Sequence, residues 1–138
     1  MPERNIKFLI DANLFVAAVK SGQTRSTDLL VELIEGPWDL VADEILILEY
    51  ERCSSKFGAH AFFRLIRRKV VVIEQSEEDI LKCKSFFPPG SGADVIHAAT
   101  CLHAEAILIS NDAHFNRIKE AGIIDVWSIK DAIKELLA

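Results

Sequence analysis

The chain has 138 residues, of which 50% are hydrophobic and 27% are charged, and its formal net charge is -5. This length and composition predict one folded domain with a hydrophobic core and exclude a disordered or low-complexity chain. The longest stretch without Asp, Glu, Lys or Arg, 95–104, is ten residues long, whereas a membrane helix needs roughly 20 apolar residues.

The first half of the chain alternates strand-like and helix-like segments. Strand formers at 6–10 precede Asp11 and Asn13, which can cap a following helix. Asp43 can cap a later helix, and the pair Gly36-Pro37 ends the helix before it. The predicted elements are a strand at 6–10, helices at 14–20 and about 24–34, a strand at 38–42, and helices at 44–57 and about 59–69.

The second half continues this alternation. The β-branched run at 70–73 is the clearest strand signal, and it predicts a strand in the sheet interior that is buried on both faces. Ser76 opens a helix with a capping box, and the prolines and glycines of 87–92 predict a loop. The remaining elements are strands at 106–109 and 124–127, and helices from about 93, at 113–121 and from 128.

Strands that alternate with helices predict an α/β fold, a three-layer α/β/α sandwich with a central, mainly parallel sheet. We expect residues 1–138 to form a single domain. Ligands bind at the carboxyl ends of the strands in such folds, so chemistry is expected at that edge.

Four acidic residues occur where this fold would bring them together. Asp11 directly follows the first strand, Asp112 follows the fourth, and Asp94 lies in the first turn of a helix. On the helix at 44–57, Glu49 lies about 70° from the centre of the apolar stripe, which directs it inward. Each residue also has a structural alternative, because an Asp can cap a helix or favour its N-terminus, and Glu49 could be an exposed helix residue.

Four carboxylates in one place repel one another unless a cation offsets their charge. Mg²⁺ and Mn²⁺ prefer oxygen ligands, neutralise a phosphodiester, and lower the pKa of a bound water. The expected chemistry is therefore phosphodiester hydrolysis.

Basic residues are concentrated in one segment. Residues 52–73 include six of the 16 Lys and Arg residues and none of the 21 Asp and Glu residues. A local basic surface suits a polyanion such as RNA, although a solvated helix face gives the same pattern. The candidates for contact with an RNA backbone are Arg64, Arg67, Arg68 and Lys69.

Four stretches resemble the acidic motifs of PIN domains, in that family's order and approximate spacing. They are 8–15 around Asp11, 44–50 around Glu49, 92–99 around Asp94 and 108–115 around Asp112. The resemblance covers nearly the whole chain, and the most similar subgroup is the small single-domain ribonucleases that include the VapC toxins of toxin–antitoxin pairs.

The resemblance implies an endoribonuclease that cleaves single-stranded RNA and requires Mg²⁺ or Mn²⁺. The implied catalytic residues and metal ligands are Asp11, Glu49, Asp94 and Asp112, and the implied substrate-positioning residues are Asn13, Ser110 and Asn111. It further implies a homodimer and, for a toxin, a small antitoxin partner.

The histidines give weaker signals. Many relatives have a further acid two residues after the last Asp, where this chain has His114. His114 could bind metal or phosphate, but we interpret it as an ordinary residue of the first helical turn, and the missing acid argues against tight binding of a second metal. His60, His97 and His103 have no ligand spacing and are expected to be surface or core residues.

Two other functions stay open from the sequence. One is a PIN-like module that binds RNA or protein without cleaving it, which absence of metal binding would favour. The other is a phosphoryl-transfer protein of receiver or phosphatase type with Asp11 as acceptor. The sequence argues against it, because Asp11 has no adjacent second acid and the fifth strand leads into Trp127 and Ser128 rather than a lysine.

The N-terminus and the cysteines indicate a cytoplasmic protein. The first five residues lead into a strand without the apolar core of a secretion signal. Cys53, Cys83 and Cys101 match neither a disulfide framework nor a zinc motif, so we expect reduced thiols.

Overall fold

The computed structural model describes residues 5–137, and these contain a five-stranded sheet in which every pair of neighbours is parallel. The strand order is β3-β2-β1-β4-β5. The strands are β1 (Lys7–Ile10), β2 (Asp39–Ala42), β3 (Val70–Val72), β4 (Ile107–Ile109) and β5 (Val126–Trp127). The predicted α/β fold with a central parallel sheet is confirmed.

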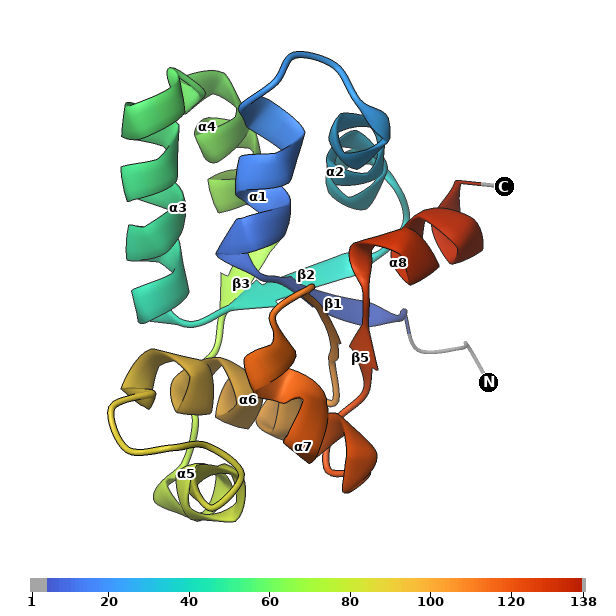
Figure 1. Cartoon of the computed structure of the whole chain (residues 1–138). Helices are drawn as coiled ribbons and strands as arrows, with labels where there is room; N and C mark the ends of the chain where they lie inside the picture. Colours follow the sequence, from blue (N-terminus) through green and yellow to red (C-terminus); the bar gives the residue numbers. More distant parts are fainter. Residues whose placement is uncertain (1–4, 138) are drawn as a thin grey trace.

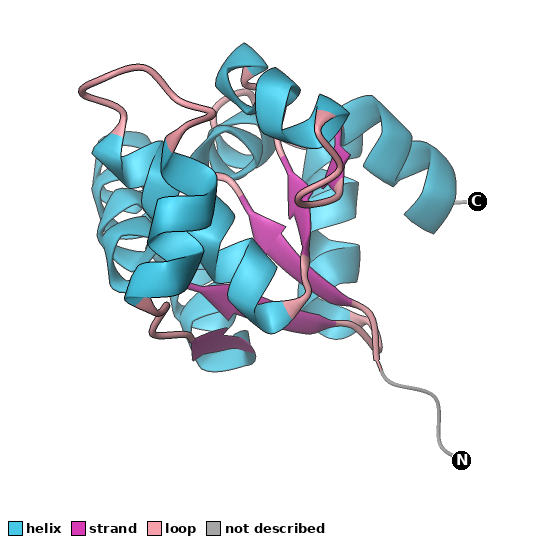
Figure 2. Ribbon diagram, turned by 90° about the horizontal axis from the view of Figure 1, so that it is seen from below, coloured by secondary structure: helices cyan, strands magenta, loops and turns pink. Residues whose placement is uncertain are grey.

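Helices cover both faces of the sheet (Figure 1). On one face lie α1 (Ala12–Val19), α2 (Arg25–Glu35), α3 (Glu44–Phe57), α4 (His60–Lys69) and α8 (Ile129–Leu136). On the other lie α5 (Glu77–Lys84), α6 (Gly92–Ala104) and α7 (Asn116–Glu120). Figure 2 shows the strands fanned across the middle of the molecule between the two groups of helices.

The apolar runs of the sequence form the core. Phe8, Leu9 and Ile10 of β1 are completely or almost completely buried, because β1 is central and has helices on both faces. The predicted helix at 44–57 is confirmed as α3, which Asp43 caps through the backbone N–H of Leu46. The chain leaves α3 at Gly58, whose φ of 65° lies in the left-handed region that glycine adopts without strain.

The prediction that 70–73 forms an interior strand buried on both faces is wrong. β3 is at the edge of the sheet and pairs with β2 alone, and Val71 and Val72 are 59% and 38% exposed. Their β-branched side chains fit a pleated strand wherever it lies, so composition predicted the strand but not its place in the sheet.

The expected helix at 113–121 is divided in two. A 3-10 turn, η1 (Ala113–Phe115), follows Asp112, and α7 begins directly after it. Asp112 accepts a hydrogen bond from the backbone N–H of His114, which stabilises this tighter turn and directs Phe115 into the core. Among residues 5–137, no helix has the length and apolar character needed to cross a membrane.

Candidate functional site

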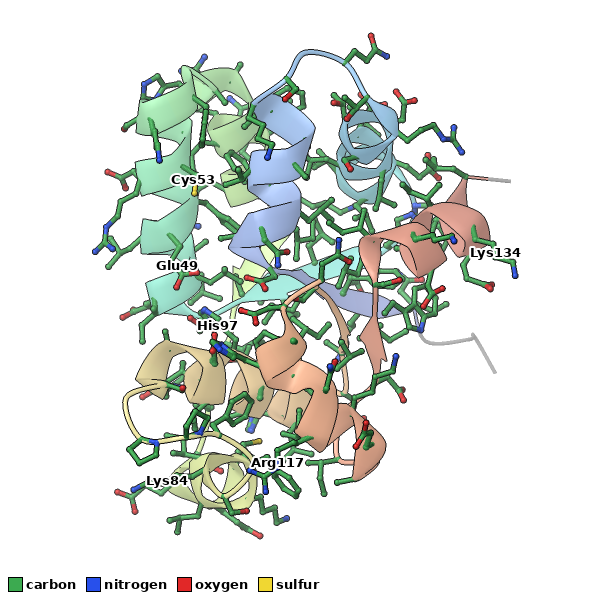
Figure 3. All side chains as sticks on the ribbon, viewed as in Figure 1. Glu49, Cys53, Lys84, His97, Arg117 and Lys134 are labelled. Carbon is green, nitrogen blue, oxygen red and sulfur yellow. The ribbon has the colours of Figure 1, made fainter. Side chains whose placement is uncertain are left out.

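Three neighbouring strands deliver polar residues to the same edge of the sheet. β1 is followed by Asp11, β2 by Asp43, and β4 by Ser110. Because β1 lies between β2 and β4 and all three are parallel, their carboxyl ends are adjacent. The N-terminal parts of α3 and α6 meet at this edge, as the facing positions of Glu49 and His97 show (Figure 3).

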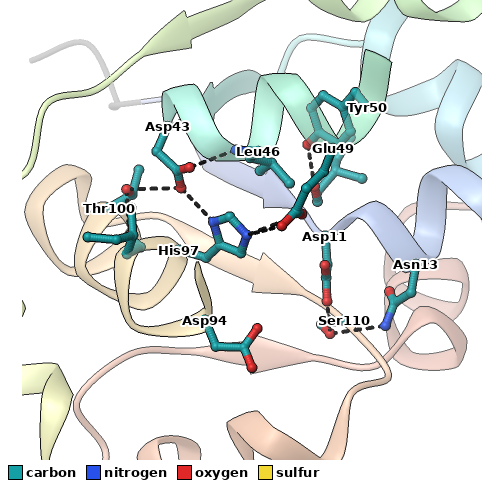
Figure 4. Close-up of polar contacts among 12 residues, drawn as sticks. Asp11, Asn13, Asp43, Leu46, Glu49, Tyr50, Asp94, His97, Thr100 and Ser110 are labelled. Atoms are coloured by element: carbon teal, nitrogen blue, oxygen red, sulfur yellow. Dashed lines mark hydrogen bonds and ion pairs between the residues drawn. The ribbon is translucent and has the colours of Figure 1, made fainter. Parts of the chain in front are cut away.

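Asp11 is held by Ser110 at the bottom of the site. The Ser110 hydroxyl donates to Oδ2 of Asp11 at 2.5 Å and accepts from the Asn13 amide at 3.3 Å (Figure 4). It also accepts from the backbone N–H of Asp112 at 3.0 Å. Burial raises the pKa of Asp11 above its ordinary value, and the hydrogen bond from Ser110 opposes that change. Asp11 is therefore a partly buried carboxylate in an environment that disfavours its negative charge.

Tyr50 fixes α3 beside β1. Its hydroxyl donates to the carbonyl oxygen of Ile10, and its ring packs on Phe15 with centroids 5.6 Å apart. Tyr50 follows Glu49 and Ile10 precedes Asp11, so this buried contact brings the two acids to the same part of the molecule.

Glu49 faces a buried histidine on α6. Both of its carboxylate oxygens lie 3.3 Å from Nε2 of His97, and the opposite ring nitrogen, Nδ1, lies 2.7 Å from Oδ2 of Asp43 (Figure 4). Burial disfavours a charged His97, but the hydrogen bonds to Asp43 and Glu49 outweigh it and raise the pKa of His97 to about 10. The imidazole is thus a cation between two carboxylates at neutral pH.

Asp94 and Asp112 converge on His114. Nδ1 of His114 lies 3.1 Å from Oδ2 of Asp94 and 3.4 Å from Oδ1 of Asp112. One ligand atom of each of the three residues lies within 4.8 Å of the others, a separation that one metal ion could bridge. Asp94 comes from the first turn of α6, and the other two come from the segment after β4.

The structure shows which of these acids cap a helix and whether Glu49 is exposed to solvent. Asp11 occupies the N-cap position of α1, but its side chain makes no capping hydrogen bond. Asp112 does cap η1, while it also approaches His114. Glu49 is not a fully solvated helix residue, because its side chain is 26% exposed and is paired with His97.

The other candidate residues either hydrogen-bond to the backbone elsewhere or lie farther from the acids. The amide oxygen of Asn111 accepts from the backbone N–H of Ile129 at 2.8 Å, and this contact fixes the start of α8. The ammonium of Lys69 donates to the carbonyl oxygen of Gly36 at 3.0 Å, which places Lys69 at the amino ends of β2 and β3. Arg64, Arg67 and Arg68 are exposed on α4, which leads into that same amino edge.

Sequence reasoning missed the second role of Asp43 and the position of His97. Asp43 was expected only as a helix cap, yet its other oxygen contacts His97 and, at 3.3 Å, the hydroxyl of Thr100. The available signal was the spacing of three residues between Asp94 and His97, which places them one turn apart on α6.

Comparisons with known proteins agree with this arrangement. The fold is similar to that in the crystal structure of VapBC2 from Rickettsia felis bound to a DNA fragment from the promoter, with a TM-score of 0.66 and 15% sequence identity over 89% of this chain and 98% of that chain. No curated protein matches the sequence with significant similarity. The family model described as PIN domain matches residues 8–121, a span that includes all four acidic motifs. The chain therefore belongs to the PIN domain family.

Proposed function

We propose that this protein is a cytoplasmic endoribonuclease that hydrolyses phosphodiester bonds of single-stranded RNA with Mg²⁺ or Mn²⁺. The observation that carries the proposal is that Asp11, Glu49, Asp94 and Asp112, from four separate segments, lie at one edge of the sheet. There, one oxygen of Asp94 and one of Asp112 lie within 4.8 Å of each other and of a ring nitrogen of His114. Among residues 5–137, the side chains that form ion pairs with these four acids are His97 and His114, without any Lys or Arg. PIN domains are generally metal-dependent nucleases, which supports the same conclusion.

The donor set fits a hard divalent cation. Carboxylate oxygens are ligands that Mg²⁺ and Mn²⁺ both accept, and a ring nitrogen of His114 lies within 4.8 Å of an oxygen of Asp94 and of Asp112. Asn13 supports the fit independently, because its amide oxygen is buried and has no hydrogen-bond partner among the described residues. A buried acceptor without a partner is unusual in a folded protein.

We assign the four acids as the residues that hold the cation. When bound, the cation would offset the charge of a phosphodiester and lower the pKa of a water molecule. Ser110 keeps the Asp11 carboxylate in a fixed orientation, and Asn13 orients the Ser110 hydroxyl. For Asn111 we propose an indirect contribution, because its side chain holds the start of α8 next to the site.

RNA contacts are proposed at two distances from the acids. Arg52 and Lys56 are exposed and follow Glu49 at i+3 and i+7, so they continue the same side of α3 away from the site. The basic residues of α4 are at the amino edge, so we propose that they contact only RNA that extends well beyond the reacting phosphate. The members of this distant group are Arg64, Arg67, Arg68 and Lys69.

We also propose a toxin role with a protein partner. An apolar groove of about 940 Å³ lies beside α6, between α5 and the loop at 85–92. Ile45 and Leu81 line this groove and are 39% and 70% exposed. Such a surface suits an apolar segment of an antitoxin, or a second copy in a homodimer. The mass of the purified protein, alone and after coexpression with the product of the neighbouring reading frame, distinguishes these partners.

The nuclease proposal is tested with pooled single-stranded RNA, because the preferred sequence is not specified by the site. We expect cleavage with Mn²⁺, loss of cleavage with EDTA, and at least an about 100-fold lower rate for Asp94→Asn. Asp131→Asn is the matched control, because Asp131 occupies the equivalent third position of α8 and is exposed. It should cleave at the wild-type rate.

The same assay can reject the proposal in two ways. Equal cleavage in EDTA and in Mn²⁺ would exclude the metal mechanism. RNA binding with Mn²⁺ bound but no cleavage of any pooled RNA would instead favour a PIN-like module that binds RNA without cutting it.

A further inference from the structure

The four acids differ in how they are held. The backbone or a neighbouring hydroxyl fixes Asp11 and Asp112. Glu49 instead projects from the middle of α3, and among residues 5–137 its carboxylate makes hydrogen bonds and ion pairs with His97 alone. A glutamate side chain loses considerable rotational freedom when it is ordered. The position of the Glu49 carboxylate therefore depends on the His97 side chain.

His97 is in turn fixed by Asp43. The side chains of both residues are 2% exposed. Oδ2 of Asp43 accepts from Nδ1 of His97 and from the hydroxyl of Thr100, while Oδ1 accepts from the backbone N–H of Leu46 at 2.8 Å. A carboxylate with three donors has little freedom, and because it binds Nδ1 it leaves Nε2 directed at Glu49.

We propose that Asp43 and His97 are positioning residues that hold the Glu49 carboxylate where the divalent cation binds. The inference rests on the proposed function, because it assigns Glu49 to the cation. α6 then has two tasks, since it supplies Asp94 directly and, one turn later, supplies the residue that orders Glu49.

A purely structural role explains this arrangement poorly. Burying a charged pair costs desolvation free energy, and apolar residues of similar volume often stabilise a fold as well or better. The second ring nitrogen of His97 also faces a half-buried acid of the site rather than the core. The Asp43, His97 and Glu49 side chains thus form a connected series that ends at the candidate metal site.

The test measures Mn²⁺ affinity of the whole protein by calorimetry or by electron paramagnetic resonance, without RNA. The main variant is Asp43→Asn/His97→Gln, because it removes both buried charges together and keeps a residue that caps α3. Asp43→Asn alone is the milder variant if the double variant does not fold. We expect an about 10-fold or larger loss of Mn²⁺ affinity for the double variant and a smaller loss for Asp43→Asn.

The chain provides a matched control in a second carboxylate–imidazole pair. Nδ1 of His103, also on α6, lies 2.8 Å from Oδ2 of Asp79 on α5, and this pair is remote from the acids. Asp79→Asn/His103→Gln makes the same chemical changes and should leave Mn²⁺ affinity within about twofold of wild type.

A Glu49→Gln background separates positioning from general damage to the fold. If His97 acts through Glu49, adding His97→Gln to Glu49→Gln should cause no further loss. An equal loss in both backgrounds, unchanged Mn²⁺ affinity, or tighter binding would overturn the inference while leaving the nuclease proposal intact. A wild-type protein that binds no Mn²⁺ would overturn both.

Discussion

The two edges of the sheet hold different side chains: the candidate acids lie at the carboxyl edge, and Lys69 lies at the amino edge. At the carboxyl edge, β1 leads into Asp11 and β4 into the segment that contains Asp112. At the amino edge, Lys69 immediately precedes β3 and donates to a carbonyl oxygen just before β2. The first four strands are three or four residues long, so they separate the edges by about 10 Å. A residue that follows a strand therefore lies close enough to the candidate acids to take part in their chemistry, whereas a residue that precedes a strand lies too far away.

This separation predicts the largest difference in cleavage rate between a substitution of an acid at the carboxyl edge and the same substitution at the amino edge. Asp11 directly follows the carboxyl end of β1, whereas Asp39 is the first residue of β2 at the amino end. Asp11→Asn should reduce the rate of RNA cleavage at least about 100-fold, because it removes charge from the site that stabilises the transition state. Asp39→Asn should change the rate less than about twofold. Comparable losses in the two variants would show that the edges are not functionally distinct.

The carboxyl edge also has its own buried cation, which makes its stability depend on pH. The pKa of His97 is raised to about 10 by its carboxylate partners despite burial, whereas an unfolded histidine has a pKa of about 6.5. A raised pKa stabilises the fold fully below the unfolded value, and this contribution is lost as pH rises toward the folded value. Between pH 7 and pH 9, the free energy of unfolding should fall by up to about 1.4 kcal/mol per pH unit from this group.

Urea unfolding in EDTA checks this dependence without bound metal. Asp43→Asn/His97→Gln lacks the buried ion pair, so its free energy of unfolding should fall less steeply between pH 7 and pH 9. The His103 pair is exposed at its histidine, so Asp79→Asn/His103→Gln should keep the wild-type slope. Identical slopes in all three proteins would contradict a charged His97.

A smaller effect is expected where one acid has both a capping and a chemical role. Asp112→Asn keeps the cap of η1, because Asn caps a helix about as well as Asp. Removing one of several repelling carboxylates should leave the metal-free protein equally stable or slightly more stable. The rise in melting temperature on adding Mn²⁺ should shrink, and the cleavage rate should fall about 10-fold. A variant with the full Mn²⁺ shift and full activity would remove Asp112 from the site.

Local patterns were sufficient to predict most of the fold and the placement of the acids. Asp11 follows an apolar run, and Glu49 is directed inward by the helical periodicity of α3. His97 could not be predicted in the same way, because its partners Asp43 and Glu49 are 54 and 48 residues away in the chain and meet it only when α6 packs against α3. The order of strands has the same origin, since alternation of elements does not specify which strand lies at the edge.

The smallest expected effects concern the basic residues, which test near which edge of the sheet the RNA binds. Arg52 and Lys56 lie along the side of α3 that contains Glu49, whereas Arg67 and Arg68 lie at the end of α4 beside the amino edge. When a protein neutralises one phosphate fewer on a single strand, the slope of log affinity against log salt concentration falls by roughly 0.7. Arg52→Ala/Lys56→Ala removes two such charges and should therefore lower the slope by about 1.4. Arg67→Ala/Arg68→Ala should lower it by less than about 0.7.

The two pairs are suited to a direct comparison, because each removes two exposed positive charges from a helix. The change in net charge is identical, so a general electrostatic attraction of RNA would weaken equally in both variants. Fluorescence anisotropy of a labelled single-stranded RNA at several salt concentrations measures the slopes, in an Asp11→Asn background that prevents cleavage. A larger reduction for Arg67→Ala/Arg68→Ala would mean that the RNA lies across the amino edge. The RNA would then have to cross the side of the molecule between the two edges of the sheet, rather than follow α3 from the acids.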